Sequence, residues 1–209
     1  MNSFLDKYNI EHKYNIERST GDIEYHPLKP FVFADTKILF LGSFPPQRKR
    51  WCIDFFYPNF INDHWRIQGL VFCGDKDAFV DTDGKLFDLP KIIAHCKTHG
   101  LGFYDTATAI RRLNDNASDK FLEVVEPTDI CKLVKQADCL KAIVTTGTKA
   151  TETICDYFGI KKTPGVGKYI PLPQLGNIVL YRLPSSSRAY PLSLEKKADA
   201  YKRMFDLFL

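Results

Sequence analysis

The sequence predicts an α/β domain with three layers, in which helices cover both faces of a central four-stranded parallel sheet. Four short apolar runs alternate with segments of helical spacing, a pattern typical of parallel β/α folds. Polar loops follow three of these runs, and open α/β sheets place their ligand sites at the carboxyl ends of the strands. The predicted strands are residues 38–41, 101–104, 142–146 and 177–183.

Five helices are predicted from apolar spacing and from residues that start or stop a helix. Pro90 suits a first helical turn, Gly100 suits a helix end, and Asp129 can cap the helix that follows it. The predicted helices are residues 65–72, 89–99, 130–136, 148–158 and 193–208. The predicted loops are residues 114–119 and the Pro- and Gly-rich stretch 161–176.

Length and composition favour one globular domain. The 209 residues suffice for a substantial core, and residues 1–36 are expected to form an N-terminal extension packed on it. The six cysteines contain no CxxC pair, which disfavours a local zinc or iron–sulfur motif, so no metal or cofactor is expected. The polar start of the sequence is not expected to act as a signal peptide, and no apolar run approaches about 20 residues. The expected localisation is therefore cytoplasmic, with no membrane partner.

The stretch from residue 37 to residue 65 mixes residue types in an unusual way. It reads KILFLGSFPPQRKRWCIDFFYPNFINDHW, a strand followed by prolines, basic residues, aromatics and amides. Aromatic rings can stack on a base, cations can hold phosphates, and an amide or carboxylate can direct a water. The alternatives are that most of these aromatics belong to the core and that residues 48–50 are a solvated charge run.

The three polar loops are GSFPP after the first strand, DTAT after the second and LPSSSR after the fourth. With NDHW at residues 62–65, their order and spacing resemble the uracil-DNA glycosylase superfamily, whose members flip a damaged base into a pocket. The GSFP form and the Asn of NDHW are nearest to the hypoxanthine/uracil glycosylase-like branch. The resemblance spans about residue 38 to the last helix.

The resemblance implies a role for each matching residue. Asn62 would position the water, with Asp63 as a second candidate, and the alternative for Asn62 is an ordinary turn residue. The base would be held by Gly42, Ser43, Phe44, Tyr57 and Asp105. Tyr57 would stack on it or be a core tyrosine, and Asp105 would contact its polar edge or cap a helix. DNA phosphates would be contacted by Ser185, Ser186, Ser187 and Arg188, or these form a plain polar turn.

Four positions depart from the family pattern. Phe44 stands where the best-known branches carry an acidic or amide residue that directs the water, and His64 replaces an aromatic. Leu183 stands where the most active branch has a histidine for the leaving group. Asp105 stands where uracil-specific members carry Asn, and an ionised carboxylate only accepts hydrogen bonds, which disfavours strict uracil specificity.

The resulting hypothesis is a monomeric, metal-independent and monofunctional DNA glycosylase that acts on deaminated bases, uracil or hypoxanthine, in base-excision repair. Its partner would be DNA with a damaged or mismatched base. One alternative is a catalytically silent DNA-binding protein that retains the fold, which Phe44 and Leu183 favour. Another is an α/β enzyme that uses the same loops on nucleotides or another small substrate.

Overall fold

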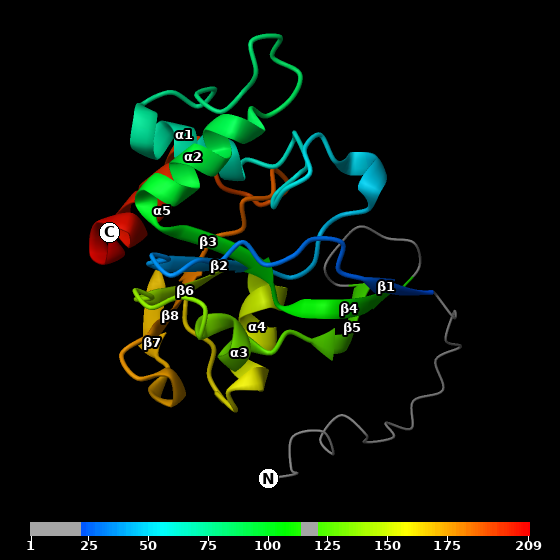
Figure 1. Cartoon of the computed structure of the whole chain (residues 1–209), viewed down its shortest axis with the longest axis vertical. Helices are drawn as coiled ribbons and strands as arrows, with labels where there is room; N and C mark the ends of the chain where they lie inside the picture. Colours follow the sequence, from blue (N-terminus) through cyan, green and yellow to red (C-terminus); the bar gives the residue numbers. More distant parts are fainter. Residues whose placement is uncertain (1–21, 114–120) are drawn as a thin grey trace.

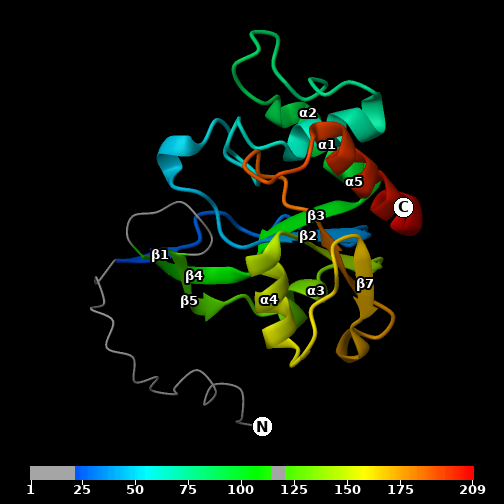
Figure 2. The ribbon, with the colours of Figure 1, turned by 180° about the vertical axis from the view of Figure 1, so that it is seen from behind.

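The computed structural model describes residues 22–113 and 121–209, and a mixed five-stranded sheet forms its centre. Helices α1, α2 and α5 cover one face of this sheet, and α3 and α4 cover the other (Figure 1; Figure 2 shows the same layers from behind). The helices are α1 (His64–Cys73), α2 (Leu89–His99), α3 (Ile130–Val134), α4 (Thr148–Tyr157) and α5 (Leu194–Phe208). All five lie within about two residues of their predicted positions.

The central sheet has the strand order β3-β2-β6-β8-β7. Its strands are β2 (Ile38–Gly42), β3 (Leu101–Asp105), β6 (Ala142–Thr146), β7 (Lys168–Pro171) and β8 (Val179–Leu183). The first, second, third and fifth of these are parallel, as predicted, but β7 runs antiparallel to β8. The prediction of a four-stranded, wholly parallel sheet was therefore wrong, because β7 lies in the predicted loop 161–176. It pairs on one side only and is mostly exposed, so it lacks an apolar run.

A second, antiparallel sheet was not predicted. It contains β1 (Ile23–Tyr25), β4 (Ala107–Arg112) and β5 (Leu122–Pro127) in the order β1-β4-β5. Strand β4 follows β3 after a single residue, so this sheet extends from the carboxyl end of the central one (Figure 1). The predicted loop 114–119 lies outside the described residues.

Local signals in the sequence explain where several elements begin and end. Asp88 and Asp129 accept hydrogen bonds from backbone N–H groups in the first turns of α2 and α3, and Ser193 does the same for α5. Gly100 ends α2 in the left-handed conformation, at φ 67°. The apolar residues 38–41 of β2 are fully buried between the two helical layers, as expected for a central parallel strand.

The N-terminal segment is joined to both sheets. Strand β1 pairs with β4, and Phe31 exchanges two backbone hydrogen bonds with Phe103 of β3, at 3.0 and 2.8 Å. Residues 22–36 therefore bring side chains from the start of the chain to the carboxyl end of β3.

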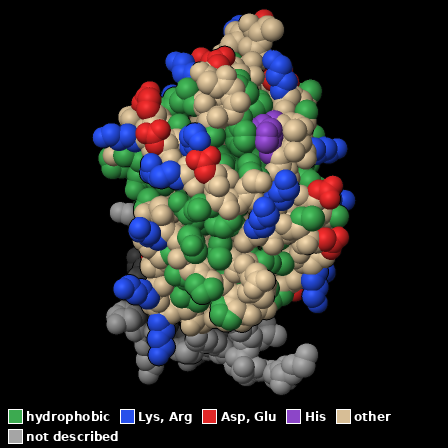
Figure 3. Space-filling view, turned by 90° about the vertical axis from the view of Figure 1, so that its left-hand side faces the viewer, with side chains coloured by type: hydrophobic (Ala, Val, Ile, Leu, Met, Phe, Trp, Pro, Cys, Tyr) green, Lys and Arg blue, Asp and Glu red, His purple; other side chains and the backbone are tan. Residues whose placement is uncertain are grey.

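Two further observations concern the charges on one face and the apolar character of the helices. The face that carries the carboxy-terminal end of α5 mixes acidic and basic side chains around apolar areas, without a dominant charge (Figure 3). Within residues 22–113 and 121–209, none of the helices combines the length and apolar character that a membrane span requires.

Candidate active site

A cavity of about 490 Å³ lies at the carboxyl ends of the parallel strands. Its walls come from the loops that follow β2, β3, β6 and β8 and from the N-terminal segment. Among the residues lining it are Gly42, Ser43, Phe44, Tyr57, Asn62, Asp105, Ser185, Ser186 and Ser187, which are nine of the predicted site residues. The two predicted residues outside this lining are Asp63 and Arg188.

The loop after β2 is fixed by bonds to its two prolines. The buried Arg112 of β4 donates to the Pro45 carbonyl at 2.6 Å, and the Trp51 indole donates to the Pro46 carbonyl at 2.7 Å. Proline cannot donate a backbone hydrogen bond, so these carbonyls are the groups through which the loop can be held. Arg112 also pairs with Glu24 of β1 at 2.8 Å, which compensates its buried charge.

Asp105, the last residue of β3, sits directly against Gly42 at the end of β2. A Cβ atom on Gly42 would lie 2.3 Å from the Asp105 Oδ1 atom, so only glycine leaves room for this carboxylate. The other oxygen, Oδ2, lies 2.8 Å from Nε2 of His26. The Asp105 backbone carbonyl accepts a bond from Thr128 at 2.7 Å. The Asp105 carboxylate is therefore held in place at the border of the cavity.

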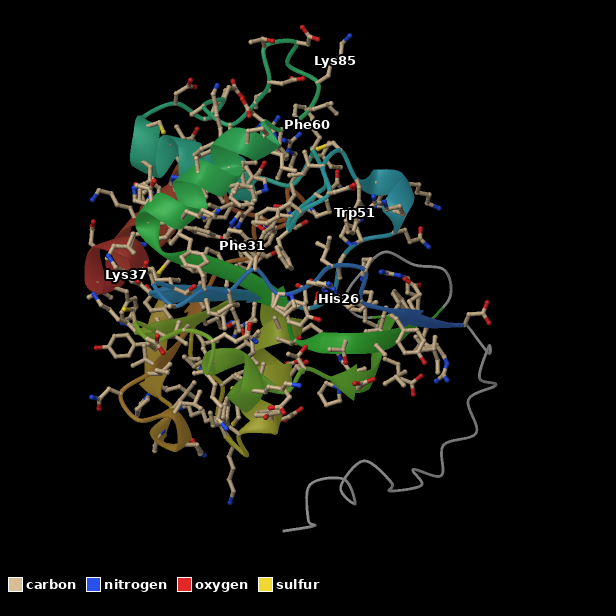
Figure 4. All side chains as sticks on the ribbon, viewed as in Figure 1. His26, Phe31, Lys37, Trp51, Phe60 and Lys85 are labelled. Carbon is tan, nitrogen blue, oxygen red and sulfur yellow. The ribbon has the colours of Figure 1, made fainter. Side chains whose placement is uncertain are left out.

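His26 comes from the segment after β1 and is almost fully buried, with 1% of its side chain exposed. Its ring packs against Phe44, Phe56 and Tyr104, with centroid separations of 5.3, 6.3 and 4.6 Å. Its Nδ1 atom lies 2.9 Å from the Leu28 carbonyl oxygen and 3.1 Å from the Leu28 amide nitrogen. Figure 4 shows His26 between the antiparallel sheet and the loop that carries Trp51.

Tyr57 is held as a flat wall of the cavity. Among the described residues it is the one non-glycine residue with a positive φ, 49°, a conformation that points to a local constraint. Its hydroxyl lies 2.9 Å from the Thr146 hydroxyl at the end of β6. Its ring stacks on His64, with centroids 3.7 Å apart and planes 2° from parallel. A base that enters the cavity can therefore stack only on the opposite face.

The ring beneath Tyr57 is neutral. Burial lowers the pKa of His64 well below its usual range, and the proximity of His95 lowers it further. Nε2 of His64 accepts from the Gln68 amide at 3.2 Å, and the Gln68 oxygen accepts from His95 at 3.1 Å. Burial, followed by the nearby His99, lowers the pKa of His95 to about 4. An uncharged polar chain thus supports the tyrosine from behind.

Asn62 and Asp63 have different surroundings. Asn62 lines the cavity, and its side-chain oxygen accepts the backbone N–H of His64 at 2.9 Å, which leaves a second lone pair able to accept from a water. Asp63 is buried and paired with the buried Lys197 at 2.9 Å and with the half-exposed Arg188 at 3.3 Å. A catalytic role for Asp63 stays a prediction, and its geometry is that of an anchor for the last loop.

The last loop is tied to the start of α1. The Ser186 carbonyl accepts from the Asp63 N–H at 3.0 Å, and the Ser187 carbonyl accepts from Lys197 at 2.8 Å. Ser185 accepts the Ser187 N–H through its hydroxyl oxygen at 3.2 Å. Leu183, just before this loop, is fully buried in the core, so it does not face the cavity.

Residues 48–50 form a short exposed 3-10 helix beside the cavity. Arg48 pairs with Asp54 and lies over the Trp51 ring, 4.4 Å from its centroid. Arg50 lines the cavity. Within residues 22–113 and 121–209, no three histidine, cysteine, aspartate or glutamate side chains gather in a way that could hold a metal ion.

His26, Arg112 and Thr146 are site residues that sequence reasoning missed. His26 appeared in the sequence only as part of a His-Pro turn signal, and it meets Asp105 from 79 positions away. Arg112 ends the ATAIRR segment, and predicting this segment as a strand would have placed Arg112 beside the loop after β2. Thr146 ends a correctly predicted strand and can be found from that position alone.

Comparison with known proteins bears on the fold. No protein-family model matches the chain, and no curated protein sequence matches it. Among solved structures, it is similar to the solution NMR structure of a "putative Uracil DNA glycosylase" from Methanosarcina acetivorans. The two chains are 23% identical with a TM-score of 0.58, and the match covers 88% of this chain and 99% of that one. This likeness shows that the chain has the fold of that protein.

Proposed function

We propose that this protein is a DNA glycosylase that hydrolyses the N-glycosidic bond of a flipped, deaminated base, uracil or hypoxanthine. The observation that carries the proposal is the convergence of Tyr57, Asn62 and Asp105 on one cavity at the carboxyl ends of the parallel strands. The volume of about 490 Å³ lies in the range of small-molecule pockets. The shared fold supports a glycosylase, and the GSFP form of the first loop favours the deaminated-base branch.

The chemistry requires three functions, and the cavity has a group for each. Loss of the base passes through a cation-like sugar, so a water must be held against it and the departing base must be stabilised. The Asn62 oxygen can hold the water. Tyr57 supplies the stacking surface, which recovers roughly 1–3 kcal/mol of the cost of flipping. Asp105 contacts the polar edge of the base.

The charges around the cavity suit a DNA substrate. Arg50 lines the cavity, and Arg188 extends from the last loop with 54% of its side chain exposed. Ser185 and Ser187 line the same cavity, and both carry hydroxyl groups. Hydroxyls and guanidinium groups are the usual partners of DNA phosphates, and such contacts fix the register of the flipped nucleotide.

The test is a base-release assay on oligonucleotides that contain uracil, hypoxanthine, xanthine or a G·T mismatch. Single and double strands are incubated with the protein and then cleaved with alkali to reveal abasic sites. We expect release from the uracil or hypoxanthine strands and its loss in Asn62→Ala. The matched control is Asn177→Ala, an exposed asparagine before the amino end of β8, which should retain full release.

The outcomes separate the alternatives. Release that survives Asn62→Ala would keep the glycosylase and remove Asn62 from its water-positioning role. No release from any strand by folded protein would refute the proposal. Tight DNA binding in that case would favour the catalytically silent protein, for which Phe44 and the buried Leu183 argue. A small-molecule ligand without DNA affinity would favour an enzyme acting on nucleotides.

A further inference from the structure

In the proposed reaction, the last loop supplies no proton donor for the departing base. A base that departs as an anion leaves faster when a nearby group gives it a proton. Leu183 occupies the place of the leaving-group histidine in the resembling family, and it is fully buried. Among the described residues that line the cavity, four carry titratable groups: Arg50, Tyr57, Asp105 and Arg112. Of these side-chain types, only a carboxyl group exchanges protons readily below the titration range of a tyrosine.

Asp105 is backed by a second titratable group. Its Oδ2 atom lies 2.8 Å from Nε2 of His26, and its side chain is 10% exposed while that of His26 is 1% exposed. Imidazole is the side chain that ordinarily changes charge between about pH 5 and 8. Of the four described titratable residues that line the cavity, Asp105 is the one that hydrogen-bonds to this buried histidine.

We propose that His26 and Asp105 act as a pair that delivers a proton to the departing base, an inference that rests on the proposed glycosylase function. With one transferable proton, the pair exists as imidazolium with carboxylate or as imidazole with carboxylic acid, and both forms are neutral overall. The Leu28 carbonyl, 2.9 Å from Nδ1, can accept from the imidazolium. A neutral pair also removes the repulsion between a carboxylate and a base anion.

The DNA, one water and the pair supply all the protons and electrons that the reaction requires. The step starts from the imidazole–carboxylic acid form, with the acid proton on Oδ1 and the Nε2–H of His26 donating to Oδ2. As the C1′–N bond breaks, its electron pair goes to the base, and Oδ1 gives its proton to the electron-rich edge of that base. The pair is then a neutral imidazole beside a carboxylate. The water that adds to C1′ releases one proton, which restores the pair. The sum is base-bearing DNA plus water, giving an abasic site and the free base.

The geometry keeps the two oxygens of Asp105 in separate roles. Oδ2 faces His26, while Oδ1 lies over Gly42, a cavity residue whose missing Cβ leaves room for that oxygen. His26 meets Tyr104 and Asp105 from β3, and the rings of Phe44 and Phe56 carry no titratable group. Arg112, whose guanidinium lies 5.8 Å from the Phe44 ring centroid, is paired with Glu24 at 2.8 Å, and Glu126 acts electrostatically on Tyr104.

Tyr104 does not compete as the proton donor. Burial raises the pKa of its hydroxyl, and the negative charges of Asp105 and Glu126 raise it further. It therefore holds its proton more tightly than an ordinary tyrosine. Tyr104 is also absent from the residues that line the cavity, which leaves Asp105 as the point of transfer.

The test compares two leaving groups in one sequence, uracil and 5-fluorouracil, in single-turnover reactions with enzyme in excess. Fluorine stabilises the departing anion, so 5-fluorouracil depends less on a proton. At pH 6 we expect His26→Gln to slow uracil release roughly 100-fold and 5-fluorouracil release by much less. The wild-type uracil rate should fall as the pH rises from about 5.5 to 8.5, and this fall should vanish in His26→Gln.

A matched control is His99→Gln. His99 is half-buried in α2 and makes a bond from Nδ1 to a backbone carbonyl, as His26 does, but its ring packs against Phe72 and His95 rather than against Asp105. It should keep both rates and the pH profile. If His26→Gln fails to fold, the wild type alone decides, because the 5-fluorouracil-to-uracil rate ratio should increase as the pair loses its proton at higher pH.

Equal slowing of both bases in folded His26→Gln, with an unchanged pH profile, would overturn the proton-delivering pair and leave His26 a structural residue. A wild-type rate ratio that does not change with pH would overturn it as well. Wild-type protein that releases neither uracil, 5-fluorouracil nor hypoxanthine would instead refute the proposed function, and the pair would fall with it. The two failures are thus distinguishable.

Discussion

Gly42→Ala tests how closely the carboxylate of Asp105 must be placed. The added Cβ atom would lie 2.3 Å from Oδ1, whereas ordinary van der Waals contact begins at 3.4 Å. The carboxylate must therefore move by about 1.1 Å, the difference between these distances. Such a move also breaks the 2.8 Å hydrogen bond to His26. A displacement of about 1 Å at a reacting group can cost roughly 100-fold in rate.

The change should affect the reaction more than the fold. Gly42 does not have a positive φ, so alanine is compatible with its backbone, and steric strain of this kind costs about 1–3 kcal/mol of stability. We expect base release to fall roughly 100-fold while DNA affinity, measured by fluorescence anisotropy, changes little. Thermal unfolding by circular dichroism checks that the variant is folded.

Gly165→Ala is the matched control for this prediction. Its added Cβ atom would meet only the Lys168 side chain at 3.7 Å, an ordinary contact in an exposed loop. It should release base at the wild-type rate. Folded Gly42→Ala protein with full base release would refute the reasoning, because it would show that the position of Asp105 does not matter to the reaction.

Three further predictions concern the stacking wall, the buried ion pair and the neutral core histidines. Tyr57→Ala should weaken binding of DNA that contains the substrate base by about 5- to 150-fold, the equivalent of 1–3 kcal/mol of lost stacking; unchanged affinity would exclude the stacking role. Lys197→Met leaves the buried Asp63 with only the half-exposed Arg188, and should lower the free energy of unfolding by about 3 kcal/mol in urea denaturation; an unchanged midpoint would contradict this. His95 has a pKa of about 4 in the folded protein against an ordinary value of 6.5, so between these pH values the unfolded chain binds a proton that the folded state does not. Stability present above about pH 6.5 should therefore decline toward pH 4, and less steeply in His95→Gln; parallel curves would refute it.

The parts of the fold that could be predicted are those with a local signal. Strands β2 and β6 are buried on both faces, so they appear in the sequence as continuous apolar runs. Helices α2 and α5 carry their own caps. Strand β7 lies at the edge of the sheet and is mostly exposed, so its composition resembles that of a loop. The strands of the antiparallel sheet are short and alternate only in part between buried and exposed residues, so their local signal is weak.

The site was predictable where its residues follow strands and unpredictable where they depend on distant partners. Asp105 and Ser185 come directly after apolar runs, and their convergence follows from parallel strands. The hydrogen bond between His26 and Asp105 joins residues 79 positions apart, and no local sequence pattern predicts it. Asp63 illustrates the reverse case. Its place beside Asn62 suggested chemistry, but the buried Lys197, 134 positions away, holds it as an anchor.

The most direct measurement of the central claim is the mass of the DNA and of the released base after a single turnover in ¹⁸O-labelled water. The account predicts free uracil or hypoxanthine and an unbroken strand whose abasic sugar carries the label. Asn62→Ala protein purified in parallel should yield neither product. An unchanged strand after incubation with folded wild-type protein, for every deaminated base tested, would contradict the account.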